Sequence, residues 1–392
     1  MTAQHLESIQ ERFMQHVERA IFDLRRGLPV VIDTPQTRYL VASIEGTSAA
    51  LLDEMRAGAR DAPQLVLTEH RLAHLGRSPA GAPAAIALQA TDSRDALIQW
   101  AADPGARWPD TRRALPISDA GHAALALMRR GLLIPAAVVI EPDDHLGPRI
   151  ARRLDRGDLL SVAAADVFAH RQAAPSLLRR VSEADVPLDA APNSRFIVFR
   201  EADGMREHVA IIIGDAACWP APVPVRLHSA CLTGDLFGSL RCDCGPQLKA
   251  SLAAIHERGG GVLLYLAQEG RGIGLANKMR AYQMQDDGLD TVDADRVLGF
   301  DQDERDYAVA REILAQLDVA HIDLLTNNPA KIDAMNREPI EVAGRSGIYG
   351  RLTRQNQRYL TTKAERAGHW LDALLQEPVL TDTPDPDRNE QD

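Results

Sequence analysis

The spacing of apolar residues along the chain alternates between a helical period and a strand period. Apolar positions three or four residues apart predict a helix over residues 8–28, and the short apolar run at 30–32 predicts a buried strand. Similar patterns continue toward the carboxyl end. They predict further helices over residues 120–130, 246–258, 303–317 and 359–375, and further strands over residues 138–140, 195–199, 209–213, 225–227, 261–266 and 321–325. This mixture indicates an α/β or α+β fold.

The stretch between residues 175 and 194 interrupts these patterns and separates two parts of ordinary domain size. We therefore predict two domains of mixed α/β type, one over residues 1–190 and one over residues 191–376. Residues 377–392 contain many acids and several prolines but almost no apolar side chains, which is typical of a disordered tail.

Composition narrows the classes of function. The chain has 392 residues, a hydrophobic content of 45% and a net charge of −11. This charge argues against a nucleic-acid partner, so a bound nucleotide would need a local cluster of cations. No apolar run has the length of a membrane span, and the polar N-terminus lacks the apolar core of a signal peptide. Together with the small number of cysteines, these features predict a cytoplasmic protein without a membrane partner.

Three of the four cysteines, Cys231, Cys242 and Cys244, lie close together in the sequence. Thiolates with this spacing suit Zn²⁺ better than a disulfide, because zinc takes sulfur ligands in a tetrahedron. A structural zinc site has four protein ligands, whereas a catalytic site has three and leaves one position to water. Three cysteines favour a catalytic zinc. Two alternatives remain: His228 is a fourth ligand of a structural site, or the thiols are buried and inert.

A glycine-rich segment at 268–280 follows a predicted strand. Its glycines allow close approach of a ligand, and Arg271, Lys278 and Arg280 supply the cations that phosphates require. The spacing matches neither the Rossmann fingerprint nor the P-loop. We interpret the segment as a phosphate-binding turn, the alternative being a solvated arginine-rich turn.

Two further segments carry polar residues at expected element ends. Thr326 and Lys331 follow the predicted strand at 321–325, where open α/β sheets place their ligands, although a simple asparagine-rich turn would look the same. The acids between 301 and 306 precede a predicted helix, where acids are also common as partners of the helix dipole.

Eight ordered motifs join these segments. They are Arg-Leu-His-Ser-Ala-Cys-Leu-Thr-Gly-Asp (226–235), Ser-Leu-Arg-Cys-Asp-Cys-Gly (239–245), Gln-Glu-Gly-Arg-Gly-Ile-Gly-Leu (268–275), Asn-Lys-Met-Arg-Ala-Tyr (277–282), Leu-Gly-Phe (298–300), Asp-Glu-Arg-Asp (303–306), Leu-Leu-Thr-Asn-Asn-Pro (324–329) and Tyr-Leu-Thr-Thr-Lys-Ala-Glu-Arg-Ala-Gly-His (359–369). With these motifs, residues 190–372 resemble GTP cyclohydrolase II, the first committed enzyme of riboflavin synthesis.

The resemblance implies a role for each matching residue. The implied zinc ligands are Cys231, Cys242 and Cys244. Asp303 is implied as the proton acceptor, Arg305 acts at the α-phosphate, and Tyr282 acts at the purine. Mg²⁺ is implied to bridge the departing pyrophosphate, and we expect a homodimer with GTP as substrate. The implied GTP contacts are Arg226, Leu227, His228, Ser229, Ala230, Gln247, Glu269, Gly270, Arg271, Thr291, Thr326 and Lys331.

These implied roles agree with the chemistry of the reaction. Opening the imidazole ring of guanine needs attack by water at C8, and a zinc-bound hydroxide is available near neutral pH. The products would be formate, pyrophosphate and 2,5-diamino-6-(5-phospho-ribosylamino)pyrimidin-4(3H)-one. Arg271, Lys331 and Mg²⁺ would balance the charge on the phosphates. Because a guanidinium stays protonated, we expect Arg305 to be essential and rank a nucleophilic role for it lower.

Ala230 departs from the family motif, which has a glutamate immediately before the first cysteine. This change removes a carboxylate that would orient the metal ligands. Two alternative functions follow. One is a paralogue that serves another pathway or stops at a partial product, and the other is a non-catalytic GTP-binding regulatory protein. The second alternative predicts erosion of the cysteines or of the segment 303–305, and the sequence retains both.

The N-terminal part resembles 3,4-dihydroxy-2-butanone-4-phosphate synthase through residues 20–32, 121–122, 131–141 and 166–171. That synthase binds Mg²⁺ through an acidic loop after its first strand. The corresponding loop here, residues 33–39, has a single acid, Asp33, whereas Mg²⁺ prefers several oxygen ligands in an octahedron. His122 and Glu141 remain. We therefore expect a degenerate domain that keeps its fold and has lost synthase activity.

Overall fold

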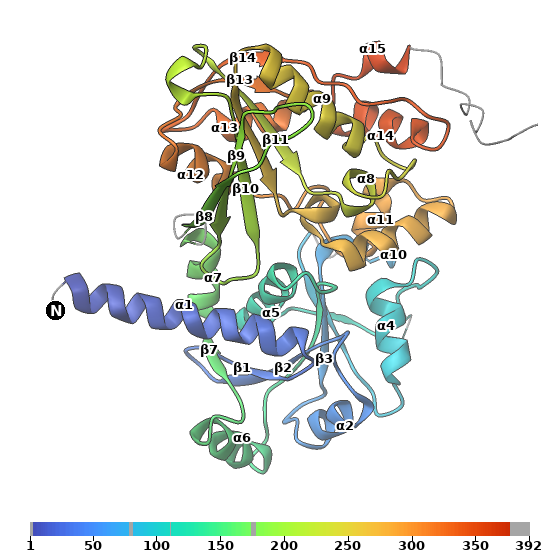
Figure 1. Ribbon diagram of the computed structural model, residues 1–392. Coiled ribbons are helices and arrows are strands. Elements are labelled where there is room, and N and C mark those ends of the chain that lie inside the picture. The colour runs from blue at the N-terminus through green and yellow to red at the C-terminus, as the bar shows by residue number, and fades with distance from the viewer. Residues whose placement is uncertain (1–2, 78–80, 110, 174–177, 377–392) are drawn as a thin grey trace, which may run out of the picture. The chain divides into compact units, whose positions relative to one another are not determined.

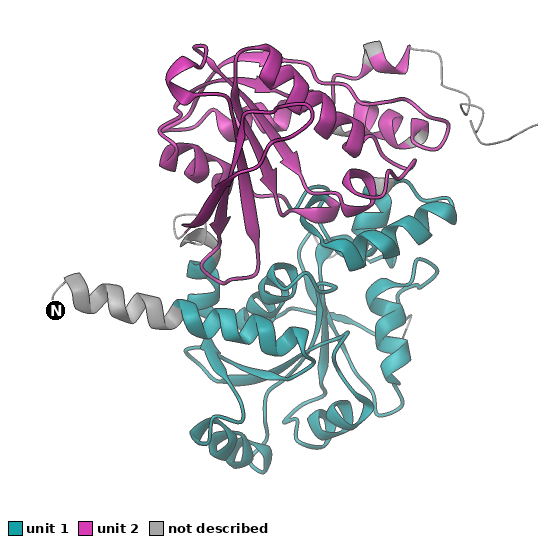
Figure 2. Cartoon of the chain, viewed as in Figure 1, with its two compact units in different colours: residues 1–174, 271–304 teal, residues 175–270, 305–392 magenta. Residues whose placement is uncertain are grey.

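The chain divides into two compact units (Figure 2). The computed structural model describes residues 3–77, 81–109, 111–173 and 178–376, and the predicted tail at 377–392 lies outside these described residues. Unit 1 comprises residues 1–174 and 271–304, and unit 2 comprises residues 175–270 and 305–392. Each unit has its own sheet with helices, which confirms the predicted mixed α/β class. The domain ranges 1–190 and 191–376 stay a prediction, because packing does not show which ranges fold independently.

Unit 1 contains a seven-stranded sheet in the order β5-β4-β3-β6-β2-β1-β7 (Figure 1). Neighbouring strands are antiparallel except for β1 and β7. The strands are β1 (Val30–Asp33), β2 (Arg38–Ser43), β3 (Gln64–Leu67), β4 (Ala84–Ala87), β5 (Ala114–Leu115), β6 (Ala136–Ile140) and β7 (Ser161–Ala163). The helices are α1 (Ala3–Arg25), α2 (Ala49–Ala57), α3 (Glu69–His74), α4 (Arg94–Ala102), α5 (Asp119–Arg130), α6 (Leu146–Asp155), α7 (Ala164–Ala173), α10 (Leu275–Asp286) and α11 (Thr291–Val297).

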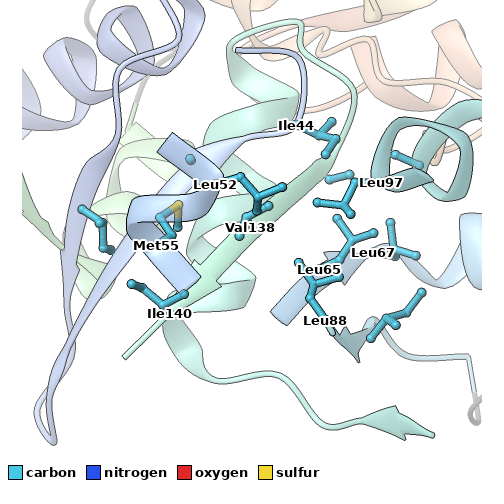
Figure 3. Packing of buried hydrophobic residues seen from close by; sticks show 14 of the residues in the cluster. Ile44, Leu52, Met55, Leu65, Leu67, Leu88, Leu97, Val138 and Ile140 are labelled. Atoms are coloured by element: carbon cyan, nitrogen blue, oxygen red, sulfur yellow. The ribbon is translucent and has the colours of Figure 1, made fainter. Parts of the chain in front are cut away.

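Both faces of the unit 1 sheet are buried, because helices cover each of them. Side chains alternate between the faces along every strand. Leu65 and Val138 point to the face that packs against Leu52 of α2, Leu97 of α4 and part of α6 (Figure 3). Helices α1, α5 and α7 pack together on the strands from the other side. This double cover explains why the strand sequences read as continuous apolar runs.

Unit 2 contains a second seven-stranded sheet in the order β14-β13-β11-β12-β10-β9-β8. Strands β14, β13, β11 and β12 run parallel, and the remaining neighbours are antiparallel. The strands are β8 (Arg179–Asp185), β9 (Ser194–Arg200), β10 (Glu207–Ile213), β11 (Val223–Ser229), β12 (Gly261–Leu266), β13 (His321–Leu325) and β14 (Glu341–Ser346). The helices are α8 (Leu232–Asp235), α9 (Cys244–Glu257), α12 (Ala308–Gln316), α13 (Pro329–Met335), α14 (Gln357–Ala367) and α15 (Asp372–Leu375).

Helices also cover both faces of the unit 2 sheet. Helix α9 contributes Ile255 to a core with Ile211 and Leu263 on one face. On the other face, Ile313 and Leu314 of α12 lie in the larger core. Among the described helices of the chain, none combines the length and the hydropathy that crossing a membrane requires.

The predicted helix at 303–317 is wrong at its beginning, because α12 begins only at Ala308. The residues before Ala308 make hydrogen bonds that are not those of a helix. The Glu304 N–H donates to Arg271 O at 3.1 Å, and the Ala308 N–H donates to the Asp306 carboxylate at 2.8 Å. Asp303 and Arg305 therefore lie on an irregular segment and not on a helix.

The predicted helix at 359–375 is also wrong as a single element. Gly368 adopts a left-handed conformation with φ of 64° and ends α14, so α15 is a separate short helix. The remaining predicted helices and strands are confirmed, with shifts at their ends.

Candidate functional site

The three clustered cysteines of unit 2 converge on one point. Their Sγ atoms all lie within 4.8 Å of one another, and Cys231 Sγ is 3.6 Å from Cys242 Sγ. Cys231 follows β11, whereas Cys244 begins α9. Gly234 permits this approach, because a Cβ atom there would lie 2.7 Å from Cys242 Sγ and 3.1 Å from Cys231 Sγ. Three convergent thiols with no side chain between them fit a soft metal ion such as Zn²⁺.

The protonation of these thiols depends on their closeness. Hydrogen bonding with Cys231, together with burial, raises the pKa of Cys242 to about 11 and that of Cys244 well above its usual range. Without a cation, Cys242 and Cys244 are therefore protonated at neutral pH. A divalent metal ion displaces these protons, because it binds the thiolate form.

The parallel strands of unit 2 place the predicted ligand-binding segments at one edge of the sheet. Strands β11, β12 and β13 end at Ser229, Leu266 and Leu325, and the segments that follow hold Cys231, Glu269 and Thr326 respectively. The Ala230 N–H donates to Leu266 O at 2.8 Å, which keeps the first two of these ends together. Carboxyl ends of parallel strands are the usual ligand-binding edge of an open α/β sheet.

His228 contacts a carboxylate and is not part of the thiol cluster. In the described residues, the group that can share a metal consists of the three cysteines alone. His228 Nε2 lies 3.0 Å from Asp235 Oδ1, and its ring stacks on Tyr265 with centroids 5.6 Å apart. Burial lowers the pKa of His228 despite the opposing effect of Asp235, so the ring is neutral at pH 7.

Asp235 also connects this histidine to the metal cluster. Its carboxylate accepts hydrogen bonds from the Cys231 N–H and from the Tyr265 hydroxyl, both at 2.9 Å. One buried acid thus orients the first cysteine and the His228 ring at the same time.

Arg226 and Gln247 form an internal network next to the cysteines. The Arg226 guanidinium donates to Leu325 O at 2.8 Å and to Gln247 Oε1 at 2.9 Å. Gln247 Nε2 donates in turn to Asp243, the residue between Cys242 and Cys244. Burial lowers the pKa of Arg226 to about 10, which leaves it charged at neutral pH.

Asp243 has a second partner from far along the chain. Lys363 Nζ of α14 lies 3.4 Å from Asp243 Oδ1, and the Asp243 side chain is fully buried. The carboxylate contributes to raising the pKa of Lys363, so this buried ammonium keeps its charge. Helix α14 therefore holds the loop that carries two of the cysteines.

Two cations predicted to contact phosphates converge on one aromatic ring. Arg305 Cζ lies 5.5 Å and Lys331 Nζ 5.8 Å from the centroid of the Tyr307 ring. Lys331 also donates to Leu227 O at 2.8 Å, and it follows β13 at the same sheet edge. Glu269, another predicted GTP contact of unit 2, accepts a hydrogen bond from the Leu232 N–H at its Oε2, at 2.6 Å.

Four other predicted residues belong to unit 1, on the segment 271–304. Arg271 has φ of 61° and follows Gly270, which also has a positive φ. The ring of Tyr282 lies 5.5 Å from Lys278 Nζ, and Asp303 is exposed. Thr291 begins α11, and its side chain lies outside the described set.

Comparison with known proteins decides the family. The family model described as GTP cyclohydrolase II matches residues 179–347. A protein of Azospirillum brasilense named GTP cyclohydrolase-2 is 42% identical over 369 residues, which cover 92% of this chain and 95% of that protein. The chain belongs to the GTP cyclohydrolase II family.

Other relatives extend the comparison. GTP cyclohydrolase-2 of Xylella fastidiosa Temecula1 is 42% identical over 361 residues, which cover 91% of this chain and 87% of that protein. The riboflavin biosynthesis protein RibBA of Bacillus mycoides is 42% identical over 259 residues, covering 64% of this chain and 65% of that protein. Among solved structures, RibBX of A. baumannii, a two-domain 3,4-dihydroxy-2-butanone 4-phosphate synthase, matches 84% of this chain and 99% of its own chain at a TM-score of 0.34 and 17% identity.

Membership of the GTP cyclohydrolase II family makes the chain an enzyme of riboflavin biosynthesis. Several polar residues around its cysteines were missed by reasoning from the sequence: Asp235, Tyr265, Asp243 and Lys363. The first lies four residues after Cys231 and the third lies between two cysteines, so proximity to the motif is the signal that could have found them. Lys363 lies in the motif at 359–369, but nothing in that motif indicates its partner, which is 120 positions away.

Reasoning from the sequence also missed Asp295 of unit 1, a carboxyl group with an unusual pKa. It is almost fully buried on α11, and its Oδ2 lies 3.7 Å from Arg271 Nη1. This distance is too long for a hydrogen bond, so the guanidinium offsets only part of the cost of burial. Burial, with help from the nearby Asp303 and Glu304, raises the pKa of Asp295 to about 7.

We expect Asp295→Asn to stabilise unit 1 at pH 8 and to stabilise it less at pH 5. The folded chain holds a proton on Asp295 up to about pH 7, whereas the unfolded chain loses it near the usual pKa of 3.8. Stability therefore falls as pH rises between these values, and a neutral amide avoids that loss, which is at most about 4 kcal/mol. Thermal unfolding at both pH values measures the difference. An Asn variant that gains equally at pH 5 and pH 8 would contradict the assignment.

Proposed function

We propose that this chain is a zinc-dependent GTP cyclohydrolase that opens the imidazole ring of GTP and releases formate and pyrophosphate. The observation that carries the proposal is the thiol cluster of Cys231, Cys242 and Cys244 at the carboxyl edge of the parallel strands. The cations Arg305 and Lys331 of the same unit converge on the Tyr307 ring, as binding of a triphosphate would require. The product would be 2,5-diamino-6-(5-phospho-ribosylamino)pyrimidin-4(3H)-one.

The residues around the thiols would hold and orient the metal. When Zn²⁺ is bound, it lowers the pKa of a water molecule toward neutrality and supplies the nucleophile for hydrolysis. Asp235 positions the backbone of Cys231, and Asp243 is held by Lys363 and Gln247. Ala230 adds no carboxylate here, so orientation of the ligands rests on these two acids.

The phosphate side of the reaction would use cations and one or more Mg²⁺ ions. Lys331 and Arg271 would balance charge on the triphosphate, and Arg305 would stabilise charge at the α-phosphate as the pyrophosphate leaves. The remaining proposed GTP contacts are Arg226, Leu227, His228, Ser229, Ala230, Gln247, Glu269, Gly270, Thr291 and Thr326. Several of them already hold internal partners, and Arg226 and Gln247 would therefore act mainly by fixing the shape of the site.

The base side of the reaction would use residues of the segment 271–304. Asp303 is exposed and would accept a proton from the attacking water, and Tyr282 would contact the purine. A homodimer, a cytoplasmic location and the alternative of a paralogue with a partial reaction stay predictions.

The N-terminal part would lack synthase activity, because its remaining acids are already paired. Asp33 accepts a hydrogen bond from Arg38 Nε at 3.0 Å and another from the Ser161 hydroxyl. Glu141 Oε1 lies 3.1 Å from Arg60 Nε. His122 lines a pocket of about 530 Å³ whose described lining contains one carboxylate, that of Glu69. A Mg²⁺ ion prefers more oxygen ligands than this.

The zinc assignment predicts about one zinc ion per chain, because three thiolates form a single site. Cys242→Ser should lose the metal and the turnover of GTP. The matched control is Cys218→Ser, since Cys218 is an exposed thiol outside the cluster. Metal analysis of the purified variants distinguishes the two, and undiminished zinc with full turnover in Cys242→Ser would refute the site.

The reaction itself is tested by incubating the pure protein with GTP and Mg²⁺ and identifying the products by mass. We expect formate, pyrophosphate and the diaminopyrimidine ribosyl phosphate. Arg305→Ala should lower kcat by at least about 100-fold with zinc retained, because the cation acts at the phosphate. Arg200→Ala, at a half-exposed arginine on β9, is the control. Normal turnover in Arg305→Ala contradicts the role, and a product that keeps its formyl carbon supports the partial reaction.

For the N-terminal part, we expect no conversion of ribulose 5-phosphate to a four-carbon ketone phosphate. The enediol intermediates need a bound divalent cation, and the loop at 33–39 has no set of acids to hold one. The full chain should therefore fail to rescue cells that lack their own synthase, while cells that lack GTP cyclohydrolase II grow. Rescue of the synthase-deficient cells would show that the activity survives.

A further inference from the structure

The segment 271–304 has an unexpected place in the structure. The GTP cyclohydrolase II family model spans residues 179–347 and so includes this segment. The structure nevertheless packs it with residues 1–174 in unit 1 (Figure 2). The segment carries Arg271, Tyr282, Thr291 and Asp303, which are four of the residues proposed for GTP binding and catalysis. Their positions therefore depend on contacts with the N-terminal part of the chain.

Arg71 of α3 makes one of these contacts. Its side chain is 1% exposed, and its guanidinium donates to Val297 O, the last residue of α11, at 2.9 Å. The other donors bond the carbonyls of Gln99, Trp100 and Asp103 at the end of α4, at 2.7–2.8 Å. The last carbonyls of a helix lack partners within the helix and attract a cation. One arginine thus completes the carboxyl ends of two helices, one from each part of unit 1.

A second contact secures the turn after α11. The Thr68 hydroxyl donates to Gly299 O at 2.8 Å, and Thr68 is fully buried. Gly299 has φ of 87°, and a Cβ atom there would lie 2.9 Å from Thr68 Oγ1. Only glycine allows this close approach of the backbone to the threonine side chain.

Helix α10 is held in a similar way at its beginning. Asn277 Nδ2 donates to Leu132 O at 3.0 Å, and Arg280 Nη2 pairs with Glu45 Oε2 at 3.0 Å. Gly274, which precedes α10, lies so close to Leu132 that a Cβ atom would be 3.1 Å from the leucine Cβ. Both helices of the segment are therefore attached to residues 1–174.

The residues that make these attachments lie close to the proposed functional side chains. Asp295 lies on α11, two positions before Val297, and its carboxylate is 3.7 Å from the Arg271 guanidinium. Tyr282 lies on α10, two positions after Arg280. A displacement of α10 or α11 would move Arg271 and Tyr282 with it, and small displacements of positioned groups cost large factors in rate.

We infer that residues 1–174 are a positioning scaffold for the segment 271–304, with Arg71 and Thr68 as positioning residues for the opening of GTP. The inference rests on the proposed function, because that function supplies the roles of Arg271 and Tyr282. It gives the N-terminal part a function that requires its fold and none of the synthase chemistry. It also explains how the loop at 33–39 can lack the acids of the synthase family while the buried polar contacts of α3 are kept.

The test compares two variants with matched controls in the full-length protein. Arg71→Lys shortens the guanidinium, and Thr68→Val removes the hydroxyl. Arg112→Lys is the control for the first, because Arg112 is a buried arginine that bonds Asp92 and Ala87 O within residues 1–174. Thr47→Val is the control for the second, because the buried Thr47 hydroxyl donates to Ser43 O.

Three quantities are measured: hydrogen exchange of the amides at 275–297, kcat and KM for GTP, and zinc content. We expect Arg71→Lys and Thr68→Val to speed exchange in this range and to lower kcat/KM by roughly 10- to 100-fold, with zinc unchanged. At a comparable loss of thermal stability, the controls should change neither the hydrogen exchange at 275–297 nor kcat/KM. Equal losses of activity in variants and controls, or unchanged activity with faster exchange, would overturn the inference.

Failure of the proposed function gives a different result. If the unmodified protein does not open GTP, the cyclohydrolase assignment is wrong, whereas the exchange data still show whether residues 1–174 hold the segment. If Arg71→Lys does not fold, Thr68→Val provides the same comparison, because it removes the hydroxyl that bonds Gly299 O and the Arg71 N–H and keeps the guanidinium.

Discussion

Three parallel strands end at one edge of the unit 2 sheet, and most of the candidate site depends on this constraint. The register of β11 with β12 pairs Ser229 with Leu266, and its register with β13 pairs Val225 with Leu324, so β13 ends beside the middle of β11. Because each strand is buried on both faces, a shift of register would expose apolar side chains. The segments that follow the strands are thereby fixed at their starting points, and polar side chains on them can converge without regular structure of their own.

Buried carboxylates then determine how the thiols are presented. Asp235 and Asp243 both lie between cysteines of the cluster in the sequence, and each is held by partners from other elements. A buried acid is costly unless it is paired. The pairs with Tyr265, His228 and Lys363 meet this requirement and fix the backbone around the cysteines. A metal site with prepared ligands loses less conformational entropy when the ion binds.

Unit 1 combines a sheet whose loop at 33–39 holds a single acid with a segment that belongs to the cyclohydrolase family region. Its core does not depend on the acids at 33–39, since the strands are buried by α2, α4, α5 and their neighbours. In such a domain, the residues that packing requires are different from those that catalysis would require. Arg71, Thr68 and Glu45 are among the residues that join residues 1–174 to the segment 271–304.

Local patterns determined much of this protein. Helical and strand periods located most strands of unit 2 and several long helices, because each element must bury one face or both, but the elements between residues 38 and 115 were not predicted. The spacing of the cysteines indicated a metal site before any contact was known. The beginning of α12 could not be read in this way, since acids favour helix starts and irregular turns alike. Gly368 ended α14 through a left-handed conformation that the apolar pattern around it does not reveal.

Tertiary structure alone decided which distant residues meet. Lys363 reaches Asp243 across 120 positions, and Arg71 reaches Val297 across 226. Such pairs depend on strand order and on how helices cross the sheets, which the pattern within an element does not encode. The division of the predicted GTP residues between the two units has the same cause. Sequence motifs identified the residues, but only the packing of α10 and α11 showed that the N-terminal part holds some of them in place, because a contact of this kind exists only after the chain has folded.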